Sequence, residues 1–194
     1  KLLWEEDKED ELVKQQVTKP AQSDIGDFEI EGISIYDSAL DHFSENQIKI
    51  NIQDWYKNKE FSTSSLYHLP KFKVYEEIQI SFKTDDKKYI IHNIDGIINQ
   101  NIDDCYKELD KTDKELSAMF KNAYKRNKKT SSHSYDKTGE SKFKDIYWKF
   151  NSGELILVSC TDWSKNMEKE KKYEDNWRVS ISSEEFDNFM IDPY

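Results

Sequence analysis

One amphipathic segment constrains the fold of this chain more than any other feature. Between residues 102 and 123, apolar side chains recur at spacings of three and four, at Ile102, Cys105, Tyr106, Leu109, Leu116, Met119, Phe120 and Ala123. This spacing places them on one face of a helix of about six turns. Because such a face must be buried, the pattern predicts a helix that packs across a sheet.

Segments with the alternation of β-strands lie on both sides of this helix. Five of them are recognisable, at residues 74–82, 89–98, 146–150, 155–160 and 177–181. The first two flank the turn sequence TDDK, which predicts a β-hairpin. Strands followed by a helix and more strands predict an α+β protein, with an antiparallel sheet and helices packed on one face.

The chain divides into a tail and one domain. Residues 1–27 are rich in charge and contain Pro20 and Gly26, so they predict a charged N-terminal tail and linker. Residues 28–194 predict a single α+β domain. The order of elements also leads to the hypothesis that this domain consists of two related α/β halves, 28–99 and 100–194.

Shorter elements are predicted at the start of the domain. Residues 28–35 alternate and predict a short strand or an extended lead-in. Ser34 with Asp37, and Ser44 with Gln47, both have the spacing of a helix capping box. Two short helices joined by a tight turn are therefore expected.

Residues 124–141 lack apolar periodicity and predict a polar loop. Its cations, with Lys121, are interpreted as the solvated end of the preceding helix. His133 and Asp136 lie in this loop and form the alternative polar site, the basis for a cofactor-independent enzyme. Acid–base chemistry needs further converging partners, which the sequence does not reveal. A solvated loop histidine is therefore the simpler interpretation.

Charge and composition exclude several classes of protein. The chain has 39 acidic and 29 basic side chains, and this net charge of −10 argues against nucleic acid as a partner. No apolar run is long enough to cross a bilayer, so we expect no integral membrane segment. Serine-hydrolase motifs, CxxC pairs and calcium-loop patterns are not found, so neither a cofactor nor a bound metal is expected.

The chain has two cysteines, Cys105 and Cys160. The first lies on the apolar face of the predicted helix and the second on a predicted central strand that this helix should cover. An even number of cysteines in an exported chain favours one disulfide. Two free buried cysteines, as in a cytosolic protein, are the alternative.

Three segments resemble a family of small, uncharacterised exported proteins from AT-rich marine bacteria: EGISIYDSALDHFS (31–44), KKYIIHNIDGII (87–98) and WRVSISSEEFDNFM (177–190). The resemblance covers residues 28–190 and implies a periplasmic or secreted protein whose signal peptide is removed or not included in the chain. It implies no activity. Tyr36 stands where relatives tend to have glycine. By element order alone, the chain also looks like the modules of β-lactamase-inhibitor proteins and of outer-membrane assembly lipoproteins, which bind other proteins.

The leading functional prediction is a non-catalytic, exported protein-interaction or structural module, with another envelope or secreted protein as partner. Trp55 and Tyr56 are the candidate protein-binding residues, because they follow the short helices and can form an exposed aromatic patch. A core role for Trp55 is the competing interpretation. The alternatives are the enzyme near His133, or a small-ligand carrier that uses an aromatic concavity on the sheet.

Overall fold

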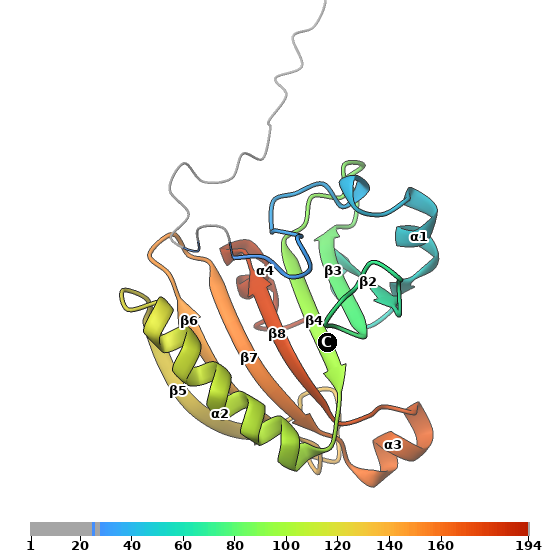
Figure 1. Ribbon diagram of the computed structural model, residues 1–194. Coiled ribbons are helices and arrows are strands. Elements are labelled where there is room, and N and C mark those ends of the chain that lie inside the picture. Colours follow the sequence, from blue (N-terminus) through green and yellow to red (C-terminus); the bar gives the residue numbers. More distant parts are fainter. Residues whose placement is uncertain (1–24, 26–27, 194) are drawn as a thin grey trace, which may run out of the picture.

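The computed structural model describes residue 25 and residues 28–193, so the predicted tail and linker fall almost entirely outside the described residues. The described chain forms one eight-stranded antiparallel sheet, in the order β1-β2-β3-β4-β8-β7-β6-β5 (Figure 1). The predicted α+β class with an antiparallel sheet is confirmed. The strands are β1 (Ile52–Gln53), β2 (Phe61–Tyr67), β3 (Glu77–Lys83), β4 (Asn93–Asn99), β5 (Tyr124–Ser132), β6 (Lys142–Lys149), β7 (Leu155–Asp162) and β8 (Asn176–Ser182). The helices are η1 (Ala39–Asp41), α1 (Glu45–Ile50), α2 (Ile102–Met119), α3 (Lys165–Lys171) and α4 (Glu184–Phe189).

Each half of the chain contributes four consecutive strands, which run in order from one edge of the sheet to its centre. Residues 28–99 contribute β1 to β4, residues 100–194 contribute β5 to β8, and the last strands of the two sets, β4 and β8, pair antiparallel at the centre. The helices do not match in the same way, because α2 has 18 residues whereas α1 has 6. The hypothesis of two related halves stays a prediction.

The amphipathic helix α2 lies along one face of the sheet (Figure 1) and contacts β7 and β8. Its buried Leu109 belongs to the main core, together with Trp148 on β6 and Val158 on β7, all of them fully buried. Ile48 of α1 is buried in the same core. In contrast, Phe186 of α4 belongs to a separate aromatic cluster. This cluster lies on the other face, because its sheet residue, Phe61, has the opposite parity on β2 to the core residue Leu66.

The segment before the first helix differs from its prediction. Residues 28–35 do not form a strand, because Ile30 and Ile33 pair with each other through two backbone hydrogen bonds of 3.1 and 3.0 Å across a tight turn. Gly32 has a φ of +75° in this turn, which glycine adopts without a steric penalty. The turn buries both isoleucines in the core.

Of the two predicted capping boxes, one is confirmed. Ser44 caps α1 by accepting a hydrogen bond from the Gln47 amide, and the Gln47 side chain accepts one from the Ser44 amide. At the first predicted box, Asp37 accepts a hydrogen bond from the Ser34 amide, but only a turn follows. The helix η1 begins after Ser38 and is three residues long.

The prediction of a polar loop at residues 124–141 is wrong for its first half, because these residues form the edge strand β5. Its side chains are polar on both faces, so it has no apolar alternation. Its backbone pairs with β6, and its cations reach acids of α2: Lys125 lies 2.5 Å from Asp113, and Lys128 lies 2.7 Å from Asp110. Lys125 and Lys128 are therefore not a solvated helix end, and lysine-rich edge strands resist pairing with other chains. The helix also ends at Met119, four residues before the predicted end.

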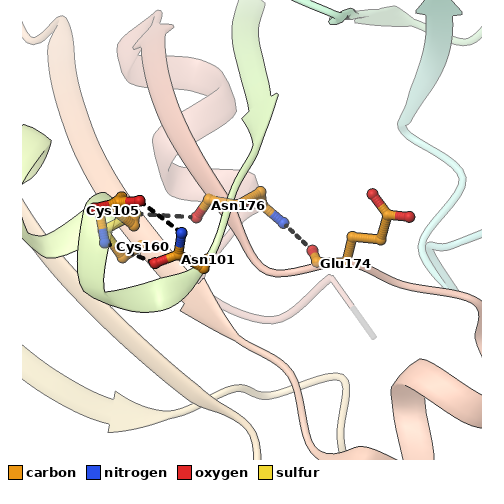
Figure 2. The surroundings of a disulfide bond; sticks show 6 residues. Asn101, Cys105, Cys160, Glu174 and Asn176 are labelled. Carbon is orange, nitrogen blue, oxygen red and sulfur yellow. Dashed lines mark hydrogen bonds between the residues drawn. A yellow bond between two sulfur atoms is a disulfide. The ribbon is translucent and has the colours of Figure 1, made fainter.

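The structure joins Cys105 of α2 and Cys160 of β7 by a disulfide bond, with a Cα–Cα distance of 5.9 Å (Figure 2). Both cysteines are buried, and the backbone carbonyl oxygen of Asn176 on β8 lies 3.3 Å from the Cys105 sulfur. The disulfide therefore attaches the first turn of α2 to the centre of the sheet.

Candidate functional site

A cleft of about 600 Å³ opens on the sheet face opposite α2. Its floor consists of alternate residues of β3, β4, β8 and β7, including Glu77, Gln79, Asn93, Asp95, Ile97, Arg178, Ser180, Ser182, Leu155 and Leu157. The residues between them, such as Ile94 and Val179, point into the core beneath α2. The cleft and the core under α2 therefore lie on opposite faces of the same strands.

Arg178 lies near the middle of this floor. The sheet register places it between Ile97 on β4 and Ser159 on β7. Its Nη1 lies 3.8 Å from Oδ2 of Asp95, while its Nε has no hydrogen-bond partner in the described part of the chain. The same is true of Oγ of Ser159 and Oδ1 of Asn176, two neighbours on the same sheet face. Hydrogen-bonding atoms of both kinds, donors and acceptors, are therefore left unpaired and buried on this face of the sheet.

The carboxylates of the floor are fixed by neighbouring polar side chains. Glu77 is buried and accepts hydrogen bonds from the Ser65 hydroxyl and, at 2.6 Å, from Nε2 of Gln79. Asp95 is also buried and accepts one from Nδ2 of Asn93 at 3.1 Å. Buried charges are costly unless they are paired or hydrogen-bonded, so these contacts hold the two carboxylates in position.

One wall of the cleft is aromatic. The Trp163 ring, between β7 and α3, lies 4.4 Å from the His133 ring and 4.8 Å from the Tyr173 ring, centroid to centroid. Burial, together with the positive charge of Arg178, lowers the pKa of His133 from 6.5 to about 4. Its Nδ1 accepts a hydrogen bond from the Tyr135 amide at 3.3 Å, so the ring is neutral with its proton on Nε2. His133 is thus part of an aromatic wall and not a solvated loop histidine.

The opposite wall contains Trp55, Tyr56 and Phe186. Tyr56 is only 8% exposed, and its ring lies 5.0 Å from that of Phe189 in an edge-to-face contact. The predicted exposed aromatic patch is therefore wrong for Tyr56, because α4 folds over it. Trp55 is half-buried against the same cluster. Both residues form part of this wall of the cleft, and their role in binding a protein stays a prediction.

Asp136 does not act together with His133. Its carboxylate accepts hydrogen bonds from the hydroxyls of Ser141 at 2.6 Å, Thr138 at 2.7 Å and Ser164 at 2.9 Å. These bonds hold the pKa of Asp136 well below its usual range. Since Ser164 is the N-cap of α3, Asp136 connects the loop after β5 to that helix. Its role is structural, and the predicted polar pair is not assembled.

The cleft gathers residues that come from distant parts of the sequence. Of the candidate residues predicted from the sequence, Trp55, Tyr56 and His133 line the cleft, whereas the disulfide lies on the other sheet face. Sequence reasoning missed Arg178 and Trp163. A signal for Arg178 was present, because it is one of only two arginines and alternates with the apolar residues of its strand.

The whole chain matches no family model, and no curated protein or solved structure matches it. The resemblance to exported proteins of marine bacteria stays a prediction. Within residues 25 and 28–193, no group of three or more His, Cys, Asp or Glu side chains is placed to hold a metal ion. None of the helices described in that part of the chain is long and apolar enough to cross a bilayer.

Proposed function

We propose that this protein binds a small organic molecule in the cleft of the sheet. The observation that carries the proposal is the cleft itself: about 600 Å³, with a polar floor between two aromatic walls. Ligand sites are typically concave, of this size, and lined by aromatic side chains with a few fixed polar groups. This is the small-ligand carrier considered from the sequence.

The chemistry of the floor supports a ligand over a purely structural role. Gln79, Asp95 and Ser180 are all more than nine-tenths buried although they line the cleft. Burying polar groups without a full set of partners costs free energy, and apolar side chains would stabilise the sheet better. A polar floor is expected where a ligand completes the hydrogen bonds.

The geometry gives less support to the other two functions. An enzyme near His133 requires a paired acid, and Asp136 is already hydrogen-bonded to the hydroxyls of Ser141 and Ser164. The prediction of a protein-interaction role was based on an exposed aromatic patch that includes Tyr56, and Tyr56 is buried. Ligand binding is therefore the function that the described residues support best.

The protein is also proposed to work in a periplasmic or extracellular space. The disulfide between Cys105 and Cys160 supports this location, because structural disulfides form and persist in oxidising compartments. A partner protein in that compartment remains compatible with a carrier of small molecules.

Filling the cleft tests the proposal. Leu157 is half-buried on the floor, so Leu157→Trp should occupy the cleft without disturbing the core face. The wild-type protein is heated with a library of saccharides, amino acids, nucleosides and carboxylic acids. At 100 times the dissociation constant, a true ligand should stabilise the fold by about 2.7 kcal/mol and raise the melting temperature by about 5 °C or more.

The matched control is Thr130→Trp, on the exposed edge strand β5 outside the cleft. Compounds that stabilise the wild-type protein should also stabilise this variant, but not Leu157→Trp. An equal shift in both variants, or no stabilising compound in the library, contradicts the proposal.

A further inference from the structure

We infer that the ligand of the cleft is an uncharged saccharide whose ring stacks on the wall formed by Trp163 and Tyr173. This inference rests on the proposed function and names the class of molecule bound. It follows from three properties of the cleft: its charge balance, the mixture of donors and acceptors on its floor, and the ring surface of one wall.

The charge balance disfavours a charged ligand. Histidines apart, four acidic and two basic side chains line the cleft: Glu77, Asp95, Glu174 and Asp187 against Lys172 and Arg178. The acidic excess repels anions, and the charge of Arg178 is already offset by Asp95 at 3.8 Å. A cation in the middle of the floor would instead meet the guanidinium of Arg178. A neutral ligand avoids both penalties.

The floor offers donors and acceptors in alternation. Arg178 donates only, Asp95 accepts only, and Ser180, which pairs with Asp95 and lies two residues from Arg178 on β8, does both. Neighbouring strands are about 4.8 Å apart, so these groups are spread over the width of a six-membered ring. Hydroxyl groups both donate and accept, and a ligand that carries several of them satisfies such a surface from any direction.

The wall supplies the apolar part of saccharide recognition. Trp163 and Tyr173 are half-buried and line the cleft, with their rings 4.8 Å apart. The face of a sugar ring that presents C–H groups packs on such aromatic surfaces, while its edges present hydroxyls. A wholly apolar ligand would leave the polar floor without partners.

The cleft also continues beyond the space of a single ring. A second hollow of about 530 Å³ shares Asn99, Lys172, Tyr173 and Glu174 with it. The lining of this hollow is polar almost throughout. Trisaccharides are therefore better probes than single sugars.

The inference is tested by calorimetric titration of the full chain with neutral trisaccharides of glucose, galactose, mannose and xylose. Trigalacturonate and triglucosamine serve as the anionic and cationic counterparts. At least one neutral probe should bind with a dissociation constant below about 1 mM, and both charged probes should bind about tenfold or more weakly than it. No binding by any neutral probe, or tighter binding of a charged one, overturns the inference.

Variants of the wall give a second readout. Trp163→Ala should weaken binding of the neutral probe about tenfold, whereas Trp163→Phe, which keeps an aromatic surface, should stay within about threefold of wild type. Tyr124→Ala is the control, because Tyr124 is exposed on β5 and outside the cleft. Wild-type affinity in a folded Trp163→Ala variant also contradicts the inference.

The outcome separates this inference from the proposed function. If library compounds stabilise the wild-type protein but not Leu157→Trp, and no neutral trisaccharide binds, the cleft is a site for another class of ligand and only the inference fails. If a trisaccharide binds equally to the wild-type protein and to Leu157→Trp, the cleft is not the site and both fail.

Discussion

The two faces of the sheet are built from the same strands but have opposite chemistry. On the face under α2, Ile94, Ile181 and Ile156 lie side by side across β4, β8 and β7. One residue further along β4, on the other face, Asp95 lies beside Ser180. Both sets are more than nine-tenths buried, and the first set lies on the face that α2 covers while Asp95 and Ser180 line the cleft. The polar face is therefore not simply a solvated surface.

The covered face holds the fold together, and its disulfide provides the largest expected effect. Replacing both Cys105 and Cys160 by alanine opens a cross-link with a sequence separation of 55 residues. In the chain-entropy model this lowers the free energy of unfolding by about 4 kcal/mol. Urea unfolding of the double variant and of the wild-type protein measures this loss in the free energy of unfolding. A loss below about 1 kcal/mol would mean that packing alone holds α2 on the sheet.

The open face should be the part of the molecule that is sensitive to pH. Because the pKa of His133 is lowered from 6.5 to about 4, the unfolded state binds a proton before the folded state does. The stability from this group is complete above pH 6.5 and is lost as the pH falls towards 4. Between pH 7 and pH 4.5 the contribution of His133 to the free energy of unfolding should fall by about 2 to 3 kcal/mol.

The control for this prediction is His133→Phe, which keeps a ring beside Trp163 but does not titrate. Its free energy of unfolding should change correspondingly less over the same pH range, whatever its stability at pH 7. If the variant and the wild-type protein show the same pH dependence in urea unfolding, the burial of His133 does not destabilise its charged form.

A pair of neighbours on β7 compares the two faces at one point. Val158 points into the core, Ser159 lies on the sheet face that carries the cleft, and both are fully buried. Val158→Ala should lower the free energy of unfolding by about 2 kcal/mol, from lost burial and the cavity that remains. Ser159→Ala should change it by less than about 0.5 kcal/mol, because the hydroxyl has no hydrogen-bond partner in the described part of the chain. Equal losses, measured by urea unfolding, would remove the contrast between the faces.

The covered face could be predicted from the sequence because apolar periodicity is its signal. The helix from Ile102 and the strands that contain Ile80, Val158 and Val179 were recognised by this pattern. The edge strand β5 could not be, since its side chains are polar on both faces and only its pairing with β6 defines it. Periodicity reports burial, and an edge strand without a buried face gives no such signal.

The cleft was harder to predict because its residues meet only through the strand order. Arg178 and Asp95 are far apart in the sequence and become neighbours through the pairing of β4 with β8, which crosses from one half of the chain to the other. The sequence did predict an aromatic concavity in general terms, and it did single out His133 and Trp55. It could not place them on opposite walls of one cleft.

An amide chemical-shift map of the ¹⁵N-labelled wild-type protein, recorded with the library compounds that stabilise it, locates the binding site. We expect saturable shifts in the strands of the floor, at residues 93–97 and 176–182, and at Trp163 in the wall, with residues 102–119 of α2 unchanged. Saturable shifts confined to α2 or to the edge strand β5, with the floor unchanged, would contradict the claim that the open face of the sheet is a ligand-binding site.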